Sequence, residues 1–140
     1  MTMQIKPYLS FKGDCEAAFR FYEQCLGGRL GAIFRYAGSP MAAQVPADWD
    51  DKIMHGNLTV GGQVLQGGDV VPERYEEPRG FSLSIEIDNI ADAERIFQEL
   101  AGGGKVVMPL EKTFWAARFG IVVDRFGIPW LVNCEVPAQQ

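Results

Sequence analysis

A single histidine, His55, is the side chain in this sequence best suited to proton transfer. Imidazole takes up and releases a proton near neutral pH, so His55 could act as a general base or a proton shuttle. It could instead be a half-buried strand residue that is hydrogen-bonded to a neighbour. One histidine cannot build a histidine-rich metal site. His55 is therefore the catalytic candidate, and it would act without a histidine-rich metal site.

Aromatic side chains and one arginine could line a binding pocket, because small-molecule sites are mostly apolar with few polar groups. Trp130 fits this role, although plain core packing is the simpler interpretation. Arg118 alternates with apolar neighbours, so it could bind an anionic group in a cavity or form a surface ion pair. Trp49 lies in a polar loop, where it is either a lid residue or a contact with another subunit. The ligand-binding candidates are Trp49, Phe114, Trp115, Arg118, Trp130 and Asn133.

Composition limits the class of protein. The chain has 140 residues, of which 47% are hydrophobic, and its net charge is -5 without a basic cluster. This charge argues against nucleic acid as a partner. The N-terminal segment has neither a basic region nor a long apolar run, and no segment is apolar enough to span a membrane. Three cysteines without a Cys-x-x-Cys pair do not indicate disulfides or structural zinc, and they favour a cytoplasmic location.

Two segments have the apolar spacing of an amphipathic helix. Apolar residues recur at positions i, i+3, i+4, i+7 and i+8 in Ala18–Leu26 and again in Ala93–Ala101. A run of glycines follows each segment, and glycine ends helices because it adopts the left-handed conformation at low cost. We therefore expect helices at residues 15–26 and 90–101. The candidate N-caps are Asp14 and Asn89.

Strand-like segments surround both helices in the same order. In the first half they are Lys6–Phe11, Arg29–Tyr36, Ile53–Val60 and Val64–Gln66. In the second half they are Phe81–Ile87, Lys105–Met108, Ala116–Val123 and Ile128–Cys134. The order of strand, helix and three strands thus occurs twice, and one constant shift places Phe21 on Phe97 and Glu23 on Glu99.

The repeat defines the domain organisation. Each half, at about 65 residues, is marginal as an independent domain, whereas paired sheets could share one core. We expect a single domain over residues 1–140, with modules at about 4–68 and 79–136. The intervening residues 69–78 contain two prolines and form the expected linker.

Four segments carry a family resemblance: PYLSFKGDCEAAFRFYEQCLGG, DKIMHGNLTVGG, GFSLSIEI and MPLEKTFWAARFGIVVDRFGIPWLVNCE. They resemble the PhnB-like branch of the vicinal-oxygen-chelate superfamily, which includes glyoxalase I, extradiol dioxygenases, fosfomycin-resistance enzymes and bleomycin-binding proteins. The resemblance implies an α+β fold in which two tandem βαβββ modules form curved mixed sheets around a cavity. The branch is often labelled methyltransferase-like, but no glycine-rich loop here connects a strand to a helix for a nucleotide-like cofactor.

The same resemblance implies positions for a divalent metal, on the first and last strands of each module. Its ligands in the superfamily are His, Glu or Gln side chains. The positions that match here are Pro7, approximately Gln66, Ser82 and Leu131. Proline and leucine side chains cannot bind a metal, and the other two are weak neutral ligands. We therefore expect neither a metal nor another cofactor.

Polar residues end the last predicted strand. Asn133 lies two residues beyond Leu131, so it should point to the same face and could form the polar floor of a pocket. A shifted site using Glu135 is less favoured, because the end of a strand lies far from the centre of the sheet. Cys134 has no basic neighbour in sequence to lower its pKa and is expected to be inert. Glu86 is expected to face solvent.

Three functions remain open at this point. The chain could be a metal-independent small-molecule-binding protein, an enzyme acting on a small anionic substrate through His55 or Arg118, or a structural module whose cavity is vestigial. The resemblance also implies pairing of modules across two chains, so we expect a homodimer. Lys6–Phe11 and Phe81–Ile87 carry few charges that would block further strand pairing. The loop 37–51, with Trp49, is expected to close over a neighbouring subunit's cavity.

Overall fold

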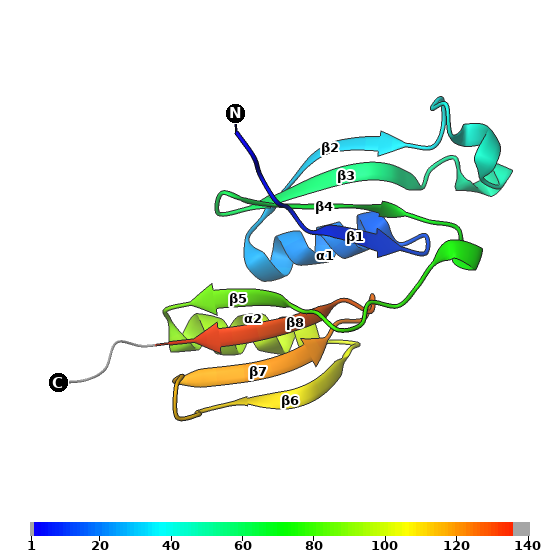
Figure 1. The fold of residues 1–140 in the computed structure, drawn as a ribbon. Coiled ribbons are helices and arrows are strands. Elements are labelled where there is room, and N and C mark those ends of the chain that lie inside the picture. The colour runs from blue at the N-terminus through cyan, green and yellow to red at the C-terminus, as the bar shows by residue number, and fades with distance from the viewer. Residues whose placement is uncertain (1, 136–140) are drawn as a thin grey trace. The chain divides into compact units, whose positions relative to one another are not determined.

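The computed structural model describes residues 2–135 and contains two compact units, Met1–Glu76 and Glu77–Gln140. Within the described residues, each unit has one α-helix and one four-stranded mixed sheet, in the order β-α-β-β-β (Figure 1). The predicted α+β fold with two tandem βαβββ modules is therefore confirmed. No helix within these residues is long and apolar enough to cross a membrane.

The first module is built around a sheet with the strand order β1-β4-β3-β2. Its elements are β1 (Tyr8–Phe11), α1 (Cys15–Leu26), β2 (Arg29–Arg35), β3 (Ile53–Val60) and β4 (Gln63–Asp69). β1 runs parallel to β4, and the other neighbours are antiparallel. β4 is longer than expected because its last residues, beginning with Gly67, pair with β1 despite their weak strand propensity.

The second module repeats this topology with the strand order β5-β8-β7-β6. Its elements are β5 (Leu83–Ile87), α2 (Ile90–Ala101), β6 (Lys105–Glu111), β7 (Arg118–Val123) and β8 (Pro129–Cys134). β6 extends beyond the predicted end at Met108 and includes Pro109. A proline is tolerated there because β6 is an edge strand, which need not donate a hydrogen bond on its free side.

One face of the first sheet is covered by α1, which lies along it in Figure 1. The helix buries Ala18, Phe19 and Tyr22 against strand residues such as Ile53 and Leu58. A glycine in β4 permits this contact: a Cβ added at Gly67 would lie 2.9 Å from the Phe19 ring and 2.7 Å from a backbone oxygen of β1. The strands approach the helix closely because that position has no side chain.

In the second module, α2 covers the corresponding face. It buries Ile96, Phe97 and Leu100 on the same side of the sheet as Trp130 and Val132. Its N-terminus begins as predicted, since the Asn89 side chain accepts a hydrogen bond from the Asp92 backbone N–H at 2.9 Å. The apolar spacing of both predicted helices is thus explained by one buried face in each module.

The start of α1 differs from expectation. Asp14 is the N-cap residue, but its side chain makes no capping hydrogen bond. Asp69, at the end of β4, takes this role: its Oδ1 accepts from the backbone N–H groups of Gly13 at 3.0 Å and Cys15 at 2.9 Å. Its Oδ2 accepts from the Ile53 N–H at 2.9 Å. One buried carboxylate therefore joins the helix start to β3 and β4.

Candidate functional site

The first sheet has a second face, opposite α1, which we call the first helix-free face. Side chains alternate along a strand, and Leu9 and Leu58 are buried on the side of α1. Their chain neighbours, such as Tyr8 and Asn57, therefore point to this face. The strand register places Tyr8 beside Gln66, Gln66 beside Asn57, and Phe34 beside His55. Side chains on the first helix-free face include those of Tyr8, Phe34, His55, Asn57 and Gln66.

His55 lies between two aromatic rings on this face. Its ring centroid is 5.6 Å from that of Tyr8 and 6.4 Å from that of Phe34. The flanking rings are accessible, with Tyr8 48% and Phe34 55% exposed. His55 is half-buried, in agreement with one of the two interpretations of this residue. The arrangement is a short aromatic row with an imidazole at its centre, and neither flanking ring was a sequence-based site candidate.

The hydroxyl of Tyr8 gives this row a polar edge. It donates a hydrogen bond to the Met54 carbonyl at 3.4 Å, above Gly68, where an added Cβ would lie 2.9 Å from the hydroxyl oxygen. Burial raises the pKa of Tyr8, and the negative charge that Cys15, Tyr36 and Asp69 can carry raises it further. Tyr8 therefore remains a neutral phenol around neutral pH, able to donate a hydrogen bond.

Asn57 adds an unused acceptor to the first helix-free face. Its Oδ1 is buried and has no hydrogen-bond partner among residues 2–135. Unpaired buried acceptors cost free energy and are uncommon in native proteins. A ligand with an N–H or O–H group could supply the missing donor.

The corresponding face of the second sheet, opposite α2, is the second helix-free face. Leu131 is the register partner of Ser84, and Asn133 is the partner of Glu86. Asn133 therefore points to the same face as Leu131, as the two-residue spacing predicts. On the other side of β8, Asn133 pairs with Phe119. Side chains on the second helix-free face include those of Ser84, Glu86, Phe119, Leu131 and Asn133.

A polar cluster occupies one end of this face. Asn133 Nδ2 donates to Glu86 Oε2 at 2.8 Å, and Ser84 Oγ donates to Glu86 Oε1 at 3.4 Å. Glu86 is exposed, as expected, whereas Asn133 is only 7% exposed. Asn133 Oδ1 is buried, and no other described residue donates to it. Asn133, the residue predicted to form a polar floor, is thus a carboxamide paired with a carboxylate.

Exposed aromatic rings lie next to this cluster. Trp115 packs edge-to-face on Phe119 at 5.1 Å and on Phe114 at 4.8 Å, measured between ring centroids. Trp115 is 46% exposed, and Phe114 is 97% exposed. The sequence analysis named the two loop residues but missed Phe119. Its position opposite Asn133 becomes evident only from the strand register.

Two candidates lie on the helix-covered side instead. Arg118 pairs in register with the fully buried Cys134, and its Nε lies 3.2 Å from Glu94 Oε1 on α2. It forms the surface ion pair that was the alternative interpretation, so in this structure its charge is already paired with that of Glu94. Trp130 is a core residue whose indole N–H donates to Asp124 Oδ2 at 2.8 Å.

Trp49 also needs correction, because it is only 8% exposed and does not stand free as a lid or an oligomer contact. Its ring contacts that of Tyr36 at a centroid distance of 6.1 Å. The backbone bonds Tyr36 N–H to Lys52 O and Ala37 N–H to Asp50 O close the base of the loop. These bonds return the chain to the sheet, so the indole of Trp49 packs on Tyr36, which precedes the loop.

The strand register bears on the metal-ligand positions that the family resemblance implies. Tyr8 and Ser84 are the first-strand residues paired with Gln66 and Leu131, whereas Pro7 and Ser82 precede β1 and β5. Leu131 still offers no ligand atom, and Tyr8 is a protonated phenol. Among residues 2–135, no group of three or more His, Cys, Asp or Glu side chains could hold a metal ion. At the positions paired in the strand register, Leu131 supplies no ligand atom, and the side chains of Tyr8, Gln66 and Ser84 are neutral groups.

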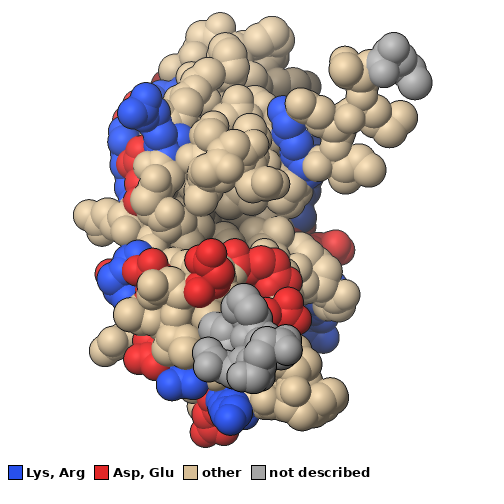
Figure 2. Space-filling view, turned by 90° about the vertical axis from the view of Figure 1, so that its left-hand side faces the viewer, with Lys and Arg blue, Asp and Glu red and all other residues tan. Residues whose placement is uncertain are grey.

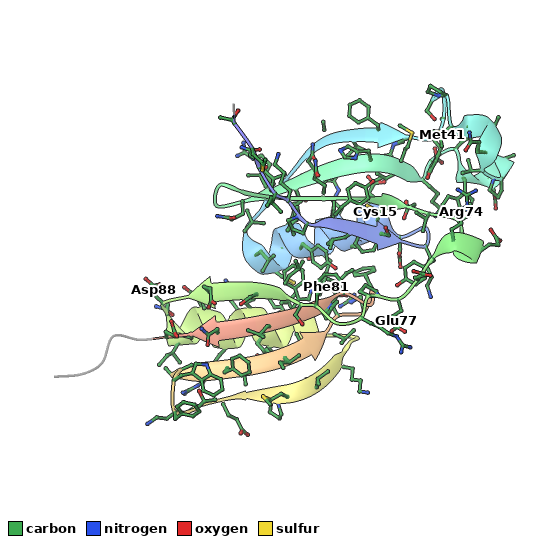
Figure 3. All side chains as sticks on the ribbon, in the orientation of Figure 1. Cys15, Met41, Arg74, Glu77, Phe81 and Asp88 are labelled. Carbon is green, nitrogen blue, oxygen red and sulfur yellow. The ribbon has the colours of Figure 1, made fainter. Side chains whose placement is uncertain are left out.

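The cysteines should resist alkylation in the folded protein. All three are free and buried. Burial raises the pKa of Cys15, which lies at the start of α1 (Figure 3), and that of Cys134. Since only thiolates react rapidly, raising the pH to 8 should leave both unmodified by iodoacetamide. Mass spectrometry of digested protein checks this, with guanidinium-unfolded protein as the fully reactive control. Rapid modification of Cys134 in native protein would contradict the expectation.

The chain has an α+β fold of two βαβββ modules, and each module has a helix-free sheet face. These features define the class of this protein. The family model of the Glyoxalase/Bleomycin resistance protein/Dioxygenase superfamily matches residues 4–132, and the chain belongs to that superfamily. It is 34% identical over 139 residues to Protein YjdN of Escherichia coli (strain K12), a match that covers 94% of this chain and 95% of that protein.

Solved structures agree with this assignment. The crystal structure of protein PA1353 from Pseudomonas aeruginosa is 50% identical, with a TM-score of 0.86 over 97% of this chain and 100% of that one. A Bacillus cereus structure described as a putative 3-demethylubiquinone-9 3-methyltransferase, PhnB protein, has a TM-score of 0.81 at 23% identity, covering 96% of this chain and 100% of that one. The second similarity shows the shared fold alone.

Proposed function

We propose that this protein binds a small organic molecule without a metal ion, and that the first helix-free face forms part of its binding surface. The observation that supports this most directly is the row of Tyr8, His55 and Phe34, whose outer rings are half exposed. Contiguous exposed aromatic groups in a soluble protein are typical of interaction sites. A planar or apolar ligand would cover these rings.

Polar groups on the same face would orient the ligand. The Asn57 carboxamide oxygen offers an unused acceptor, and the Tyr8 hydroxyl, which donates its hydrogen to the Met54 carbonyl, offers a second acceptor at the edge of the aromatic row. A few placed polar groups beside apolar rings are typical of small-molecule pockets. This combination favours a binding protein comparable to the drug-sequestering members of the superfamily.

A second candidate function is an enzyme that uses His55 as a general base. The observation that favours it is the position of the imidazole, half-buried at the centre of the proposed ligand surface. Arg118 no longer supports an anionic substrate, since it is paired with Glu94 on the other side of its sheet. Chemical conversion of the bound molecule would distinguish catalysis from storage or sequestration.

We also propose a cytoplasmic homodimer. β1 and β5, whose segments carry few charges, are both edge strands of their sheets. Edge strands offer unpaired backbone groups that can extend a sheet into a second chain. If the protein is found to be a dimer that binds no ligand, a purely structural role is favoured.

Native mass spectrometry of the full chain, gently purified from its own host, tests these proposals together. We expect twice the mass of the 15.5 kDa chain, together with an additional organic mass and no stoichiometric transition metal. Phe34→Ala should reduce the fraction carrying the organic mass several-fold, since it removes one ring of the row. Ile5→Ala, which truncates an exposed apolar side chain ahead of β1, is the matched control and should leave that fraction unchanged. Equal occupancy in both variants would contradict the proposed surface.

A further inference from the structure

We infer that the second helix-free face recognises organic cations, specifically compounds in which an ammonium group with N–H donors is attached to an aromatic body. This inference rests on the proposed function, because it takes the helix-free faces as the ligand-binding sides of the sheets. It goes further by naming a second set of residues and a chemical class. The central pair is Glu86 and Asn133.

The first step is the row in which these residues lie. The strand register aligns Glu86 on β5, Asn133 on β8, Phe119 on β7 and Glu111 on β6. Two of the four are carboxylates and none is basic, so the row favours positive charge. Figure 2 shows Asp and Glu side chains on the second module, in the lower half of the view, with Lys and Arg side chains toward its margins. Asp88, labelled in Figure 3, directly follows the end of β5.

The second step is the orientation of the Asn133 amide. Its Nδ2 lies 2.8 Å from Glu86 Oε2, and a carboxylate oxygen only accepts hydrogen bonds. The flipped amide would place two acceptors against each other, so the hydrogen-bond pattern fixes Nδ2 toward Glu86. Asn133 Oδ1 is consequently the atom left buried without a donor from residues 2–135.

The third step is the chemistry that satisfies these groups. The Glu86 carboxylate and Asn133 Oδ1 both accept, so a complementary ligand must donate, and its donor should be cationic because Glu86 is an anion. An alkylammonium has up to three N–H donors, so it could contact the exposed carboxylate and then the buried Asn133 Oδ1, once the side chains over that oxygen move aside. The exposed carboxylate provides the first contact. Donation to Asn133 then removes the cost of an unpaired buried acceptor.

The fourth step is the aromatic body of the ligand. Phe119 neighbours Asn133 on the opposite side from Glu86, and Trp115 extends the aromatic surface outward. Neighbouring strands lie ~4.8 Å apart, so the backbones at Glu86 and Phe119 are separated by ~9.6 Å. An aryl ring joined to an ammonium by a two-carbon chain is of suitable length to place its ring toward Phe119 while its nitrogen meets Glu86.

The probe we choose is therefore 2-phenylethylammonium, with neutral 2-phenylethanol as the matched control compound. Each is titrated into the ¹⁵N-labelled full-length protein, and amide chemical shifts report both the affinity and the residues affected. We expect shifts concentrated on β5, β7 and β8, and about tenfold tighter binding of the ammonium, because hydrogen bonds to charged groups are the stronger ones.

Glu86→Gln tests the carboxylate itself, because the amide keeps the size of the side chain and an oxygen that accepts from Asn133. It should weaken binding of the ammonium by about tenfold and remove its advantage over the alcohol. Glu99→Gln is the matched control, since Glu99 lies on α2 in an exposed pair with Arg95. It should change neither affinity.

The outcomes separate the two proposals. If the ammonium and the alcohol shift this face with equal affinity, or if Glu86→Gln binds the ammonium as tightly as the native chain, the cation inference is overturned while small-molecule binding stands. If neither compound shifts this face, the cation inference also fails, and the native mass spectrometry result then decides the proposed function separately. The comparison of the two compounds on the native chain needs no variant, so poor folding of Glu86→Gln would not remove the test.

Discussion

Replacing Asp69 by alanine should lower the free energy of unfolding by at least about 3 kcal/mol. The Asp69 carboxylate is 2% exposed and accepts backbone N–H groups from Gly13, Cys15 and Ile53. Alanine would leave all three donors without this acceptor, and buried unpaired donors each cost about 1–3 kcal/mol. Urea denaturation followed by far-ultraviolet circular dichroism measures the loss.

Two further variants identify the cause. Asp69→Asn keeps an oxygen for two of the donors but turns an NH₂ group toward the third, so its loss should be intermediate. Glu76→Ala removes an exposed carboxylate near the end of the first module and should change the free energy of unfolding by less than about 0.5 kcal/mol. If Asp69→Ala resembled Glu76→Ala, the carboxylate would not hold the helix start to the sheet.

The repeated architecture was predictable because it depends on local periodicity. Each helix buries one stripe of apolar residues, and the glycine after α1, Gly27, adopts the expected left-handed conformation with φ 74°. The ends of strands were less predictable. β4 continues through Gly67 and Gly68 because β1 and β3 supply its hydrogen bonds, and glycine gives no sequence signal for such pairing.

The candidate site was predictable only where strand alternation decides the side. Spacing from Leu131 correctly placed Asn133, whereas the partners of Arg118 and Trp130 lie on other elements of the fold. Glu94 is 24 residues from Arg118 in sequence, so no local pattern reveals that ion pair. Tyr8 and Phe119 were missed because an aromatic residue in a strand resembles a core residue until the covered face of the sheet is known.

Each module uses a buried aspartate to organise backbone near its sheet, Asp69 in the first and Asp124 in the second. The two Asp124 oxygens accept from the backbone N–H groups of Phe126 and Ile128 and from the Trp130 indole. The indole N–H of Trp130 is thus used inside the module, where it helps to hold the turn before β8.

Trp130→Ala should therefore be among the most destabilising substitutions in the second module. The side chain is 2% exposed on the side of the sheet that faces α2, and truncation of a large buried aromatic costs about 3–5 kcal/mol. Trp130→Phe keeps much of the ring volume but removes the donor to Asp124, which should cost about 1–3 kcal/mol. Trp115→Phe, at a half-exposed position, is the control and should cost less than about 1 kcal/mol.

Urea denaturation followed by far-ultraviolet circular dichroism distinguishes these contributions, because its signal comes mainly from the backbone and does not rely on tryptophan fluorescence. The expected order of losses is Trp130→Ala, then Trp130→Phe, then Trp115→Phe. A loss for Trp130→Ala no larger than that for Trp115→Phe would show that Trp130 is not a core residue and would restore it as a ligand-binding candidate. Equal losses for the two Trp130 variants would instead assign the effect to the hydrogen bond with Asp124 and to the part of the indole that phenylalanine lacks, since these are missing from both.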